Sequence, residues 1–237
     1  MADRNDLMAL SGLSLEEGAL KKLSLYREML LDWNTRMDLT SVSDAETVQR
    51  HFLDSLLPLS FPGLIPEKGR LIDVGTGAGF PGMPLAIACP GLEVTLLEAQ
   101  GKRCRFLEAV QSALELTNVQ VIQERAEVLG RAEGHREGYD RAVARAVAPL
   151  NVLCEYLLPF VRTGGLALCW KGPAVFEEME DGKSAALQVG GSVEEPIETA
   201  LEERRHVVVP IRKMEKTLPQ FPRKNGIPVK RPLKSGK

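Results

Sequence analysis

Cysteine and histidine are scarce in this chain of 237 residues, and the few present stand far apart. None of the four cysteines forms a C-x-x-C pair, and no histidine lies near one at the spacing of metal ligands. Such spacing provides neither a disulfide framework nor a zinc site. We therefore expect no metal, and we expect the cysteines to be buried apolar residues in a reducing compartment. They are Cys89, Cys104, Cys154 and Cys169.

Long apolar runs are missing as well. No stretch approaches the roughly 18 apolar residues that a membrane-spanning helix needs. Residues 1–6 contain no basic region leading into an apolar one, so we expect no signal peptide and a cytoplasmic protein. With 44% hydrophobic and 26% charged residues, the composition excludes collagen-like and disordered chains.

Positive charge is scarce in most of the chain and concentrated at one end. Residues 204–237 carry eleven Lys and Arg against one acidic residue, a net charge of +10. Because the whole chain has a net charge of −2, residues 1–203 carry −12. An acidic body with a basic end indicates a polyanionic partner, and a solvated tail without a ligand is the alternative.

Residues 1–66 are predicted to form a helical N-terminal extension. Apolar side chains recur there at steps of three and four, which places them on one face of a helix. They are Leu20, Leu23, Tyr26, Leu30 and Trp33. A capping box at residues 43–46 begins a second helix, and the prolines and glycine at 58–66 form a connection.

Residues 70–171 change rhythm and belong to the main domain, which we predict at residues 67–213. Short apolar runs alternate there with amphipathic stretches, which is typical of βαβ units and a parallel sheet covered on both faces. We therefore expect a doubly wound α/β fold. The runs are Leu71–Val74, Val94–Leu97, Val119–Ile122, Arg141–Ala144 and Leu166–Trp170.

The pattern is weaker after Lys171. Residues 174–203 predict one helix and an irregular connection. Val207–Ile211 predict the last strand, in which Pro210 favours an edge position or a bulge. Residues 214–237 form a basic, proline-rich C-terminal tail without periodicity, typical of a loose tail.

A glycine-rich loop follows the first predicted strand. Asp73 begins a D-x-G-x-G-x-G pattern that continues through Gly75, Gly77 and Gly79. Glycines let the chain turn tightly and bring backbone N–H groups against a ligand, and the helix that follows favours an anionic group. Glu98 ends the second strand, where a carboxylate can accept hydrogen bonds from ribose hydroxyls. A plain turn and a solvated strand end are the alternatives.

Two cofactor classes share this arrangement, NAD(P) and S-adenosylmethionine. Asp73 would repel a pyrophosphate, whereas it suits the ammonium group of S-adenosylmethionine. No Tyr-x-x-x-Lys pair occurs, and the three histidines lie away from the strand ends where a dehydrogenase base is placed. The residues therefore favour methyl transfer over hydride transfer.

The glycine loop and the residues around Glu98 resemble the bacterial 16S rRNA guanine-N7 methyltransferase family, first called glucose-inhibited division protein B. Further matching segments extend the resemblance over residues 33–233. They are 33–40, 50–55, 145–150, 170–172, 204–209 and 221–228. Asp38 departs from the family, which commonly has asparagine there, and 174–203 matches nothing.

The resemblance implies a class I S-adenosyl-L-methionine-dependent methyltransferase, with a Rossmann-like, mostly parallel seven-stranded sheet and a helical N-terminal extension. The substrate would be a guanine of 16S rRNA, guanine 527, in free RNA, an assembly intermediate or the small ribosomal subunit. Carried over by position, the cofactor contacts are Asp73, Gly75, Gly77, Gly79 and Phe80 in the loop, Glu98 at the ribose, Ala126 and Glu127 by the adenine, and Arg145 at the methionine side or the target pocket.

Further polar residues are candidates for contact with the RNA. Those near the target base are Asn34, Arg36, His51 and Lys171. Those on phosphates are Lys102, Arg103, Arg204, Arg223, Lys224, Lys230 and Arg231. A core histidine at position 51 and a solvated helix start at 102–103 are the alternatives.

The chemistry needs no catalytic constellation, because guanine N7 carries a lone pair and no proton and can attack the sulfonium methyl directly. A cytosine-C5 enzyme commonly needs a Pro-Cys nucleophile, and an exocyclic-amine enzyme commonly shows Asn-Pro-Pro-Tyr after the fourth strand; both are missing. A methyltransferase of the same fold acting on a small molecule or protein, and a nucleotide- or RNA-binding module without catalysis, remain the alternatives.

Overall fold

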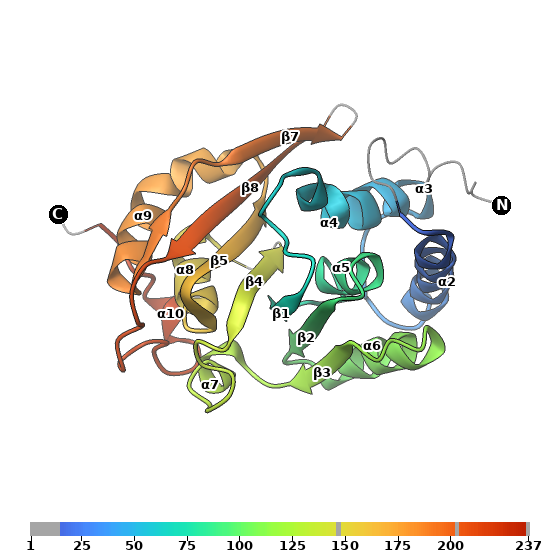
Figure 1. The fold of residues 1–237 in the computed structure, drawn as a ribbon, viewed down its shortest axis with the longest axis horizontal. Helices are drawn as coiled ribbons and strands as arrows, with labels where there is room; N and C mark the ends of the chain where they lie inside the picture. Colours follow the sequence, from blue (N-terminus) through green and yellow to red (C-terminus); the bar gives the residue numbers. More distant parts are fainter. Residues whose placement is uncertain (1–14, 146–147, 202–203, 236–237) are drawn as a thin grey trace.

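The computed structural model describes residues 15–145, 148–201 and 204–235, and its centre is a mostly parallel sheet (Figure 1). The strand order is β3-β2-β1-β4-β5-β8-β6, with β7 also paired to β8. The first five strands are parallel, as the alternating pattern predicted. They are β1 (Gly69–Val74), β2 (Leu92–Glu98), β3 (Val119–Gln123), β4 (Tyr139–Arg145) and β5 (Val161–Lys171).

The far edge of the sheet is antiparallel. Strand β8 (Arg204–Lys213) pairs with β5 on one side, and on the other side with both β6 (Gly191–Val193) and β7 (Ile197–Leu201). Eight strands therefore occupy seven positions, because the edge strand is interrupted at residues 194–196. The irregular connection expected between 174 and 203 is wrong, since most of its second half belongs to these two strands.

Pro210 lies in a strand that is paired on both sides, so its expected edge position is wrong. Its carbonyl accepts a hydrogen bond from the Glu194 N–H at 2.9 Å, at the break between β6 and β7. The N–H and C=O positions of one strand residue point to the same side. Proline has no N–H, and at Pro210 that missing donor faces the break. No β-ladder hydrogen bond is therefore lost there.

Helices cover both faces of the sheet (Figure 1). Consecutive strand residues face opposite sides, so Leu71 belongs to one hydrophobic cluster and Ile72 to the other. The first cluster includes side chains of α2 (Glu17–Asn34), α5 (Gly82–Ala88) and α6 (Gly101–Ala113). The second includes α7 (Ala126–Leu129), α8 (Leu150–Leu157) and α9 (Met179–Gln188), which follows the 3₁₀ turn η3 (Pro173–Glu178).

The described residues of the predicted N-terminal extension, from residue 15 onward, are largely helical, whereas residues 1–14 of that prediction lie outside the described part of the chain. In α2 the side chains of Leu23, Tyr26 and Leu30 are fully buried in the first cluster. A second helical run passes through α3 (Asp44–Thr47), the π-helical turn η1 (Val48–Leu53), α4 (Asp54–Leu56) and the 3₁₀ turn η2 (Leu57–Ser60). The π-helical turn is notable because such turns are frequent at functional sites. Among the described helices, none has the length and hydropathy to cross a membrane.

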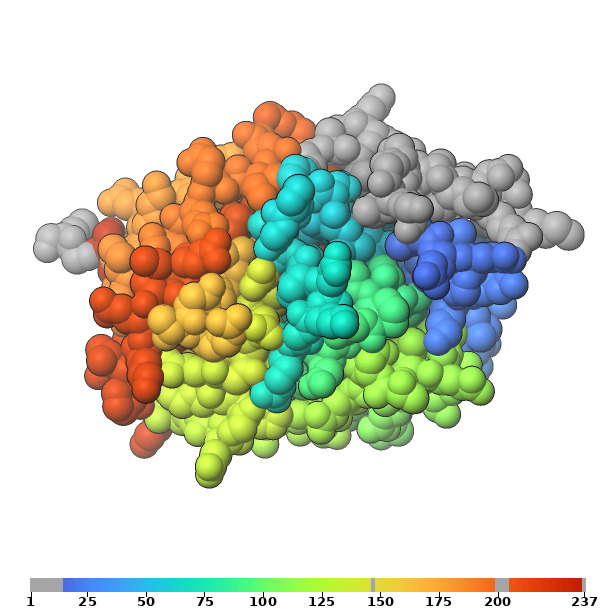
Figure 2. Space-filling view, in the orientation of Figure 1, coloured from blue at the N-terminus to red at the C-terminus, as the bar shows by residue number. Residues whose placement is uncertain are grey.

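The C-terminal segment is not a loose tail, so that expectation is wrong. Arg131 donates to the carbonyls of Pro219, Gln220 and Pro222, and Arg136 donates to those of Thr217, Leu218 and Phe221. The Phe221 ring is buried in the second cluster, and a short helix, α10 (Ile227–Lys230), follows. In Figure 2 the red C-terminal residues border the yellow part of the chain.

The four cysteines are free thiols. Cys104, Cys154 and Cys169 are buried, and Cys89 is half-buried. The described residues contain no cluster of three or more metal-ligating side chains.

Candidate functional site

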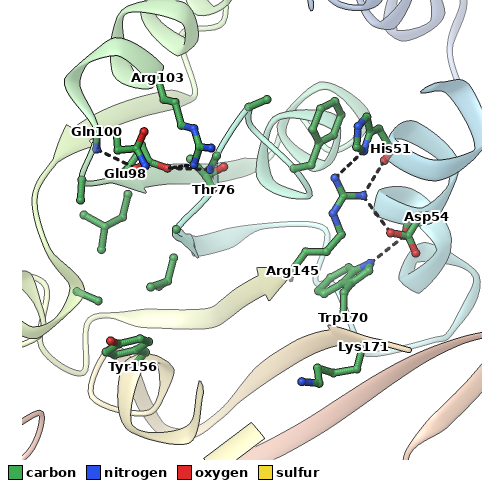
Figure 3. Close-up of a pocket in the computed structure, with 18 of the residues that line it drawn as sticks. His51, Asp54, Thr76, Glu98, Gln100, Arg103, Arg145, Tyr156, Trp170 and Lys171 are labelled. Atoms are coloured by element: carbon green, nitrogen blue, oxygen red, sulfur yellow. Dashed lines mark hydrogen bonds and ion pairs between the residues drawn. The ribbon is translucent and has the colours of Figure 1, made fainter. Parts of the chain in front are cut away.

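An open cleft of about 1310 Å³ lies at the carboxyl ends of the parallel strands. Each strand supplies a wall residue: Gly75 follows β1, Glu98 ends β2, Ala126 follows β3, Arg145 ends β4 and Lys171 ends β5. The strand order therefore sets the sequence of these residues along the cleft: Ala126, Glu98, Gly75, Arg145 and Lys171. Figure 3 shows Glu98, Gln100 and Arg103 on one side and Arg145, His51 and Asp54 on the other.

The loop after β1 requires glycine because its backbone is left-handed at three positions. The φ angles of Gly75, Gly77 and Gly79 are 71°, 62° and 99°. At Gly79 a Cβ atom would lie 2.4 Å from the Tyr26 hydroxyl. That hydroxyl donates to the carbonyl of Ala78, and the Tyr26 ring stacks on Phe80. Helix α2 thus supports the loop from behind.

Asp73 lies behind the cleft wall and is completely buried. Its Oδ2 accepts hydrogen bonds from Thr76 Oγ1 at 2.6 Å and from the Gly82 N–H at 2.7 Å. Its Oδ1 has no hydrogen-bond partner among the described residues. Burial raises the pKa of Asp73 to about 6. Within the described part of the chain, one oxygen of this carboxylate therefore has no donor. Neither Asp73 nor Gly79, both predicted as cofactor contacts, lines the cleft.

Glu98 lines the cleft with a carboxylate that is only 6% exposed. Its Oε2 accepts from the Gly77 N–H at 3.0 Å, and its Oε1 accepts from the Gln100 N–H at 2.8 Å. Arg103 Nη1 lies 3.8 Å from Glu98 Oε2. Because a carboxylate oxygen can accept more than one hydrogen bond, Glu98 both fixes the glycine loop and keeps acceptor capacity for a ligand.

The end of the cleft beyond β3 includes a residue from the C-terminal segment. Ala126 and Glu127 begin α7, and Tyr156 and Val229 line the cleft beside them. Glu127 Oε1 accepts from the Gly226 N–H at 2.8 Å, so this carboxylate anchors the tail. Burial and the neighbouring Glu127 raise the pKa of Tyr156 to about 12.

Arg145 is the centre of the opposite end. Its Nη1 donates to the Arg50 carbonyl at 2.9 Å and to Asp54 Oδ2 at 3.0 Å, and its guanidinium lies 5.0 Å from the centre of the Phe80 ring. Its Nη2 donates to His51 Nδ1 at 3.0 Å. Arg145 thereby ties β4 to η1 and α4 of the N-terminal part.

His51 has both ring nitrogens engaged. Since arginine cannot accept a hydrogen bond, His51 Nδ1 accepts from Arg145, and Nε2–H donates to Thr40 Oγ1 at 2.7 Å. The ring stacks on Phe80, with centroids 4.6 Å apart. Burial and the charge of Arg145 lower the pKa of His51 to about 3, so the imidazole is neutral near pH 7.

Asp54, Trp170 and His206 line the same end of the cleft and were not predicted as site residues. Asp54 Oδ1 lies 2.9 Å from His206 Nδ1, and the Asp54 carbonyl accepts from Trp170 Nε1 at 2.8 Å. One sequence signal could have found Asp54: it stands three residues after His51 in a predicted helix, so both face the same side.

Among the predicted target contacts, His51 and Lys171 line the cleft, whereas Asn34 and Arg36 do not. Lys171 Nζ lies 2.8 Å from Glu178 Oε2 and 3.1 Å from the Ala148 carbonyl. The Asn34 side chain bonds the backbone of Leu39 and Thr40, and Arg36 forms an exposed ion pair with Asp32. Asn34 therefore shapes the turn after α2.

The predicted phosphate contacts fall into different environments. Arg103 lines the cleft, and Lys102, Lys224, Lys230 and Arg231 are exposed. Arg223 instead forms an ion pair with Glu155, so its guanidinium is occupied. Arg204 begins β8, and its side chain lies outside the part of the molecule that the structure describes. Arg50, Arg125 and Arg205 also line the cleft.

The sheet order, the glycine loop and the carboxylate at the end of β2 define the fold of class I methyltransferases. A solved structure with this fold is a mutant of the 16S rRNA (adenine(1408)-N(1))-methyltransferase from Catenulisporales acidiphilia. It is 15% identical, with a TM-score of 0.51 and coverage of 63% of this chain and 87% of the other. At this identity the similarity concerns the fold alone.

Sequence comparison is more specific. The pattern of the family described as rRNA small subunit methyltransferase G matches residues 19–208. The chain is 45% identical to the ribosomal RNA small subunit methyltransferase G of Alkaliphilus metalliredigens, over 94% of each chain. It is 46% identical to that of Roseiflexus castenholzii, over 94% of this chain and 95% of the other. The chain belongs to the rRNA small subunit methyltransferase G family.

Proposed function

We propose that the protein transfers the methyl group of S-adenosylmethionine to N7 of a guanine in 16S rRNA of the small ribosomal subunit, in the cytoplasm. The proposal rests on one observation: the same cleft has two ends with different chemical character. The glycine loop and Glu98 form a nucleoside-binding half, whereas Phe80, Arg145 and Trp170 form an aromatic, hydrogen-bonding half. A cofactor and a nucleobase can therefore meet where the halves join.

The residues present fit S-adenosylmethionine. The free Oδ1 of buried Asp73 suits the ammonium group of the methionine part, and the acceptor capacity of Glu98 suits the ribose hydroxyls. A Cβ at Gly77 would meet only Arg103 Nη1, at 4.0 Å, so the loop leaves room beside it. When bound, this cofactor supplies an electrophilic methyl group on a sulfonium.

The geometry of the target half suits a nucleophile that has no proton to lose. His51 is neutral and has both nitrogens engaged, so it is not placed to act as a general base. The guanine gains positive charge during methyl transfer. In the pocket that would hold this guanine, the carboxylate of Asp54 offsets the positive charge of Arg145. Rate acceleration then comes from alignment and from the electrostatic surroundings of the reacting atoms.

Replacing Glu98 by alanine should weaken S-adenosylmethionine binding by about 1.5–3 kcal/mol, as for removal of a hydrogen bond to a charged group. The effect has two sources, because the carboxylate contacts the ribose and also holds the Gly77 N–H. Isothermal titration calorimetry measures the change. Glu93→Ala is the matched control, since Glu93 lies on the same strand but is exposed. Equal affinity of Glu98→Ala and wild type would remove Glu98 from the cofactor site.

Neutralising the exposed tail cations should reduce the salt dependence of RNA binding. In the triple variant Lys224→Gln, Lys230→Gln, Arg231→Gln, the slope of log K against log salt should fall by about one for each cation that binds a phosphate in the wild type. This variant is preferable to truncation, because the tail backbone is bonded to Arg131 and Arg136. Lys183→Gln, an exposed change on α9 outside the cleft, is the control. An unchanged slope in the triple variant would exclude these cations as phosphate contacts.

Methyl transfer to unmodified RNA tests the proposed function. Purified protein with tritiated S-adenosylmethionine should label 16S rRNA, as naked RNA or as small subunits, and labelling should decrease steeply with salt. Labelling of protein or small molecules in a cell extract, with no label in either form of rRNA, would instead favour the alternative methyltransferase. Cofactor binding without any turnover would favour the binding module.

A further inference from the structure

The strand order predicts where each part of the proposed cofactor lies. Asp73 lies near the end of β1, the glycine loop follows that strand, and together they suit the methionine part. Glu98 ends the adjacent strand β2 and suits the ribose. Continuing in the same direction leads to β3 and the start of α7. The adenine ring should therefore lie beside Ala126, at the end of the cleft farthest from Arg145.

Val229 of the C-terminal segment lines the cleft, although it comes about one hundred residues after α7 in the chain. It belongs to the short helix α10 and is 58% exposed. An apolar side chain on the rim of a cleft remains in contact with water until a ligand covers it. A flat aromatic ring against Val229 would remove apolar surface on both sides from water, which is favourable.

The position of Val229 is fixed by contacts on the preceding residues. Gly226 has a φ of 75°, a conformation that favours glycine, and its N–H donates to Glu127 Oε1 at 2.8 Å. Pro228 is buried. Three residues before Gly226, Arg223 is bonded to buried Glu155 of α8. Because Glu127 belongs to α7, the same helix holds the tail and borders the predicted adenine site.

We propose that the C-terminal segment is part of the cofactor site: Val229 covers the adenine ring, and Glu127 is the positioning residue that holds Val229 there. The proposal rests on the proposed use of S-adenosylmethionine. It explains why a carboxylate that sequence reasoning placed by the adenine instead accepts a hydrogen bond from the tail. It also makes cofactor binding and tail docking stabilise each other, because each orders a segment that the other contacts.

The test compares Val229→Ala with Leu218→Ala. Leu218 is the matched control because it is also an exposed apolar tail residue, 52% exposed, but does not line the cleft. Calorimetry should be done with two ligands, S-adenosylmethionine and 5′-methylthioadenosine, which retains the adenine and ribose and lacks the amino acid. Val229→Ala should weaken both ligands by the same factor, about fivefold, from the apolar area no longer buried. Leu218→Ala should leave both affinities unchanged.

The possible outcomes separate this inference from the proposed function. Wild-type protein that binds neither ligand would overturn the proposed cofactor and the inference together. Wild-type binding that Val229→Ala leaves intact would overturn the inference alone, as would an effect on S-adenosylmethionine without one on 5′-methylthioadenosine. The unfolding temperature of Val229→Ala should match wild type, because the side chain is exposed. Glu127→Ala should then weaken both ligands as well, and Glu127→Gln, which keeps an acceptor, should retain more of the affinity.

Discussion

Replacement of Arg145 by alanine should lower the free energy of unfolding by about 3 kcal/mol and abolish methyl transfer. Removing one partner of a buried ion pair costs about 3–5 kcal/mol because it leaves an uncompensated charge. Asp54, 7% exposed at its side chain, would lose its arginine partner. The lower end of the range applies because His206 Nδ1 remains 2.9 Å from Asp54 Oδ1. Activity should disappear because the hydrogen bonds to Arg50 and His51, which shape the target half, are no longer made.

Urea unfolding and a methyl-transfer assay check this prediction. Arg145→Lys retains the charge but not the planar fork that reaches the Arg50 carbonyl, Asp54 and His51 together, so it should recover stability more than activity. Arg162→Ala, which breaks the more exposed ion pair to Asp140, should cost at most about 1 kcal/mol. An Arg145→Ala protein as stable and as active as wild type would refute the role assigned to Arg145.

Replacement of Arg223 by alanine should lower the free energy of unfolding by about 3–5 kcal/mol, the cost of breaking a buried ion pair. Glu155, whose side chain is 1% exposed, accepts from Arg223 Nε and Nη2 at 2.6–3.0 Å. Of the hydrogen bonds that Glu155 accepts from the described residues, the one from the Arg223 N–H would remain. Urea unfolding measures the change, and Lys224→Ala, one residue on and exposed, should alter the stability little.

The same variant distinguishes a structural role from RNA contact. If Glu155 occupies the guanidinium, Arg223→Ala should leave the salt slope of RNA binding unchanged once the protein is folded. The double variant Glu155→Leu, Arg223→Leu should recover part of the stability, because it removes both charges together. A fully stable Arg223→Ala protein with a lower salt slope would instead make Arg223 the phosphate contact expected from sequence.

Local sequence was sufficient to predict the glycine loop and the carboxylate at the end of β2, which lie at the same edge of the sheet. The loop residues from Asp73 to Gly79 are contiguous, and their glycines are needed for left-handed backbone. Glu98 ends the next strand at a spacing typical of nucleoside-binding folds. Chain direction in a parallel sheet brings these groups to one edge. The resemblance to a known family then added Arg145, for which no local pattern provides a signal.

The part of the site that sequence could not predict depends on contacts between residues far apart in the chain. Asp54 and Arg145 are 91 residues apart, and Glu127 and Gly226 are 99 residues apart. The tail is held mainly through its backbone carbonyls, which accept hydrogen bonds from Arg131 and Arg136. Backbone contacts place no demand on the spacing of apolar side chains, so the tail sequence shows no periodicity. Pro210 follows the rule that proline avoids ladder positions, but the interruption that accommodates it lies in the neighbouring strand.

The atom that receives the methyl group decides whether the protein is a guanine-N7 methyltransferase. Small-subunit rRNA lacking the modification is incubated with the protein and S-adenosylmethionine, then treated with borohydride and aniline, which cleave the chain at N7-methylguanine. We expect one new cleavage, at a guanine of 16S rRNA. It should be absent with the Arg145→Ala protein and, at limiting S-adenosylmethionine, reduced with the Glu98→Ala protein. Methyl label in the RNA without cleavage would place the methyl group on another atom and contradict the assignment of N7.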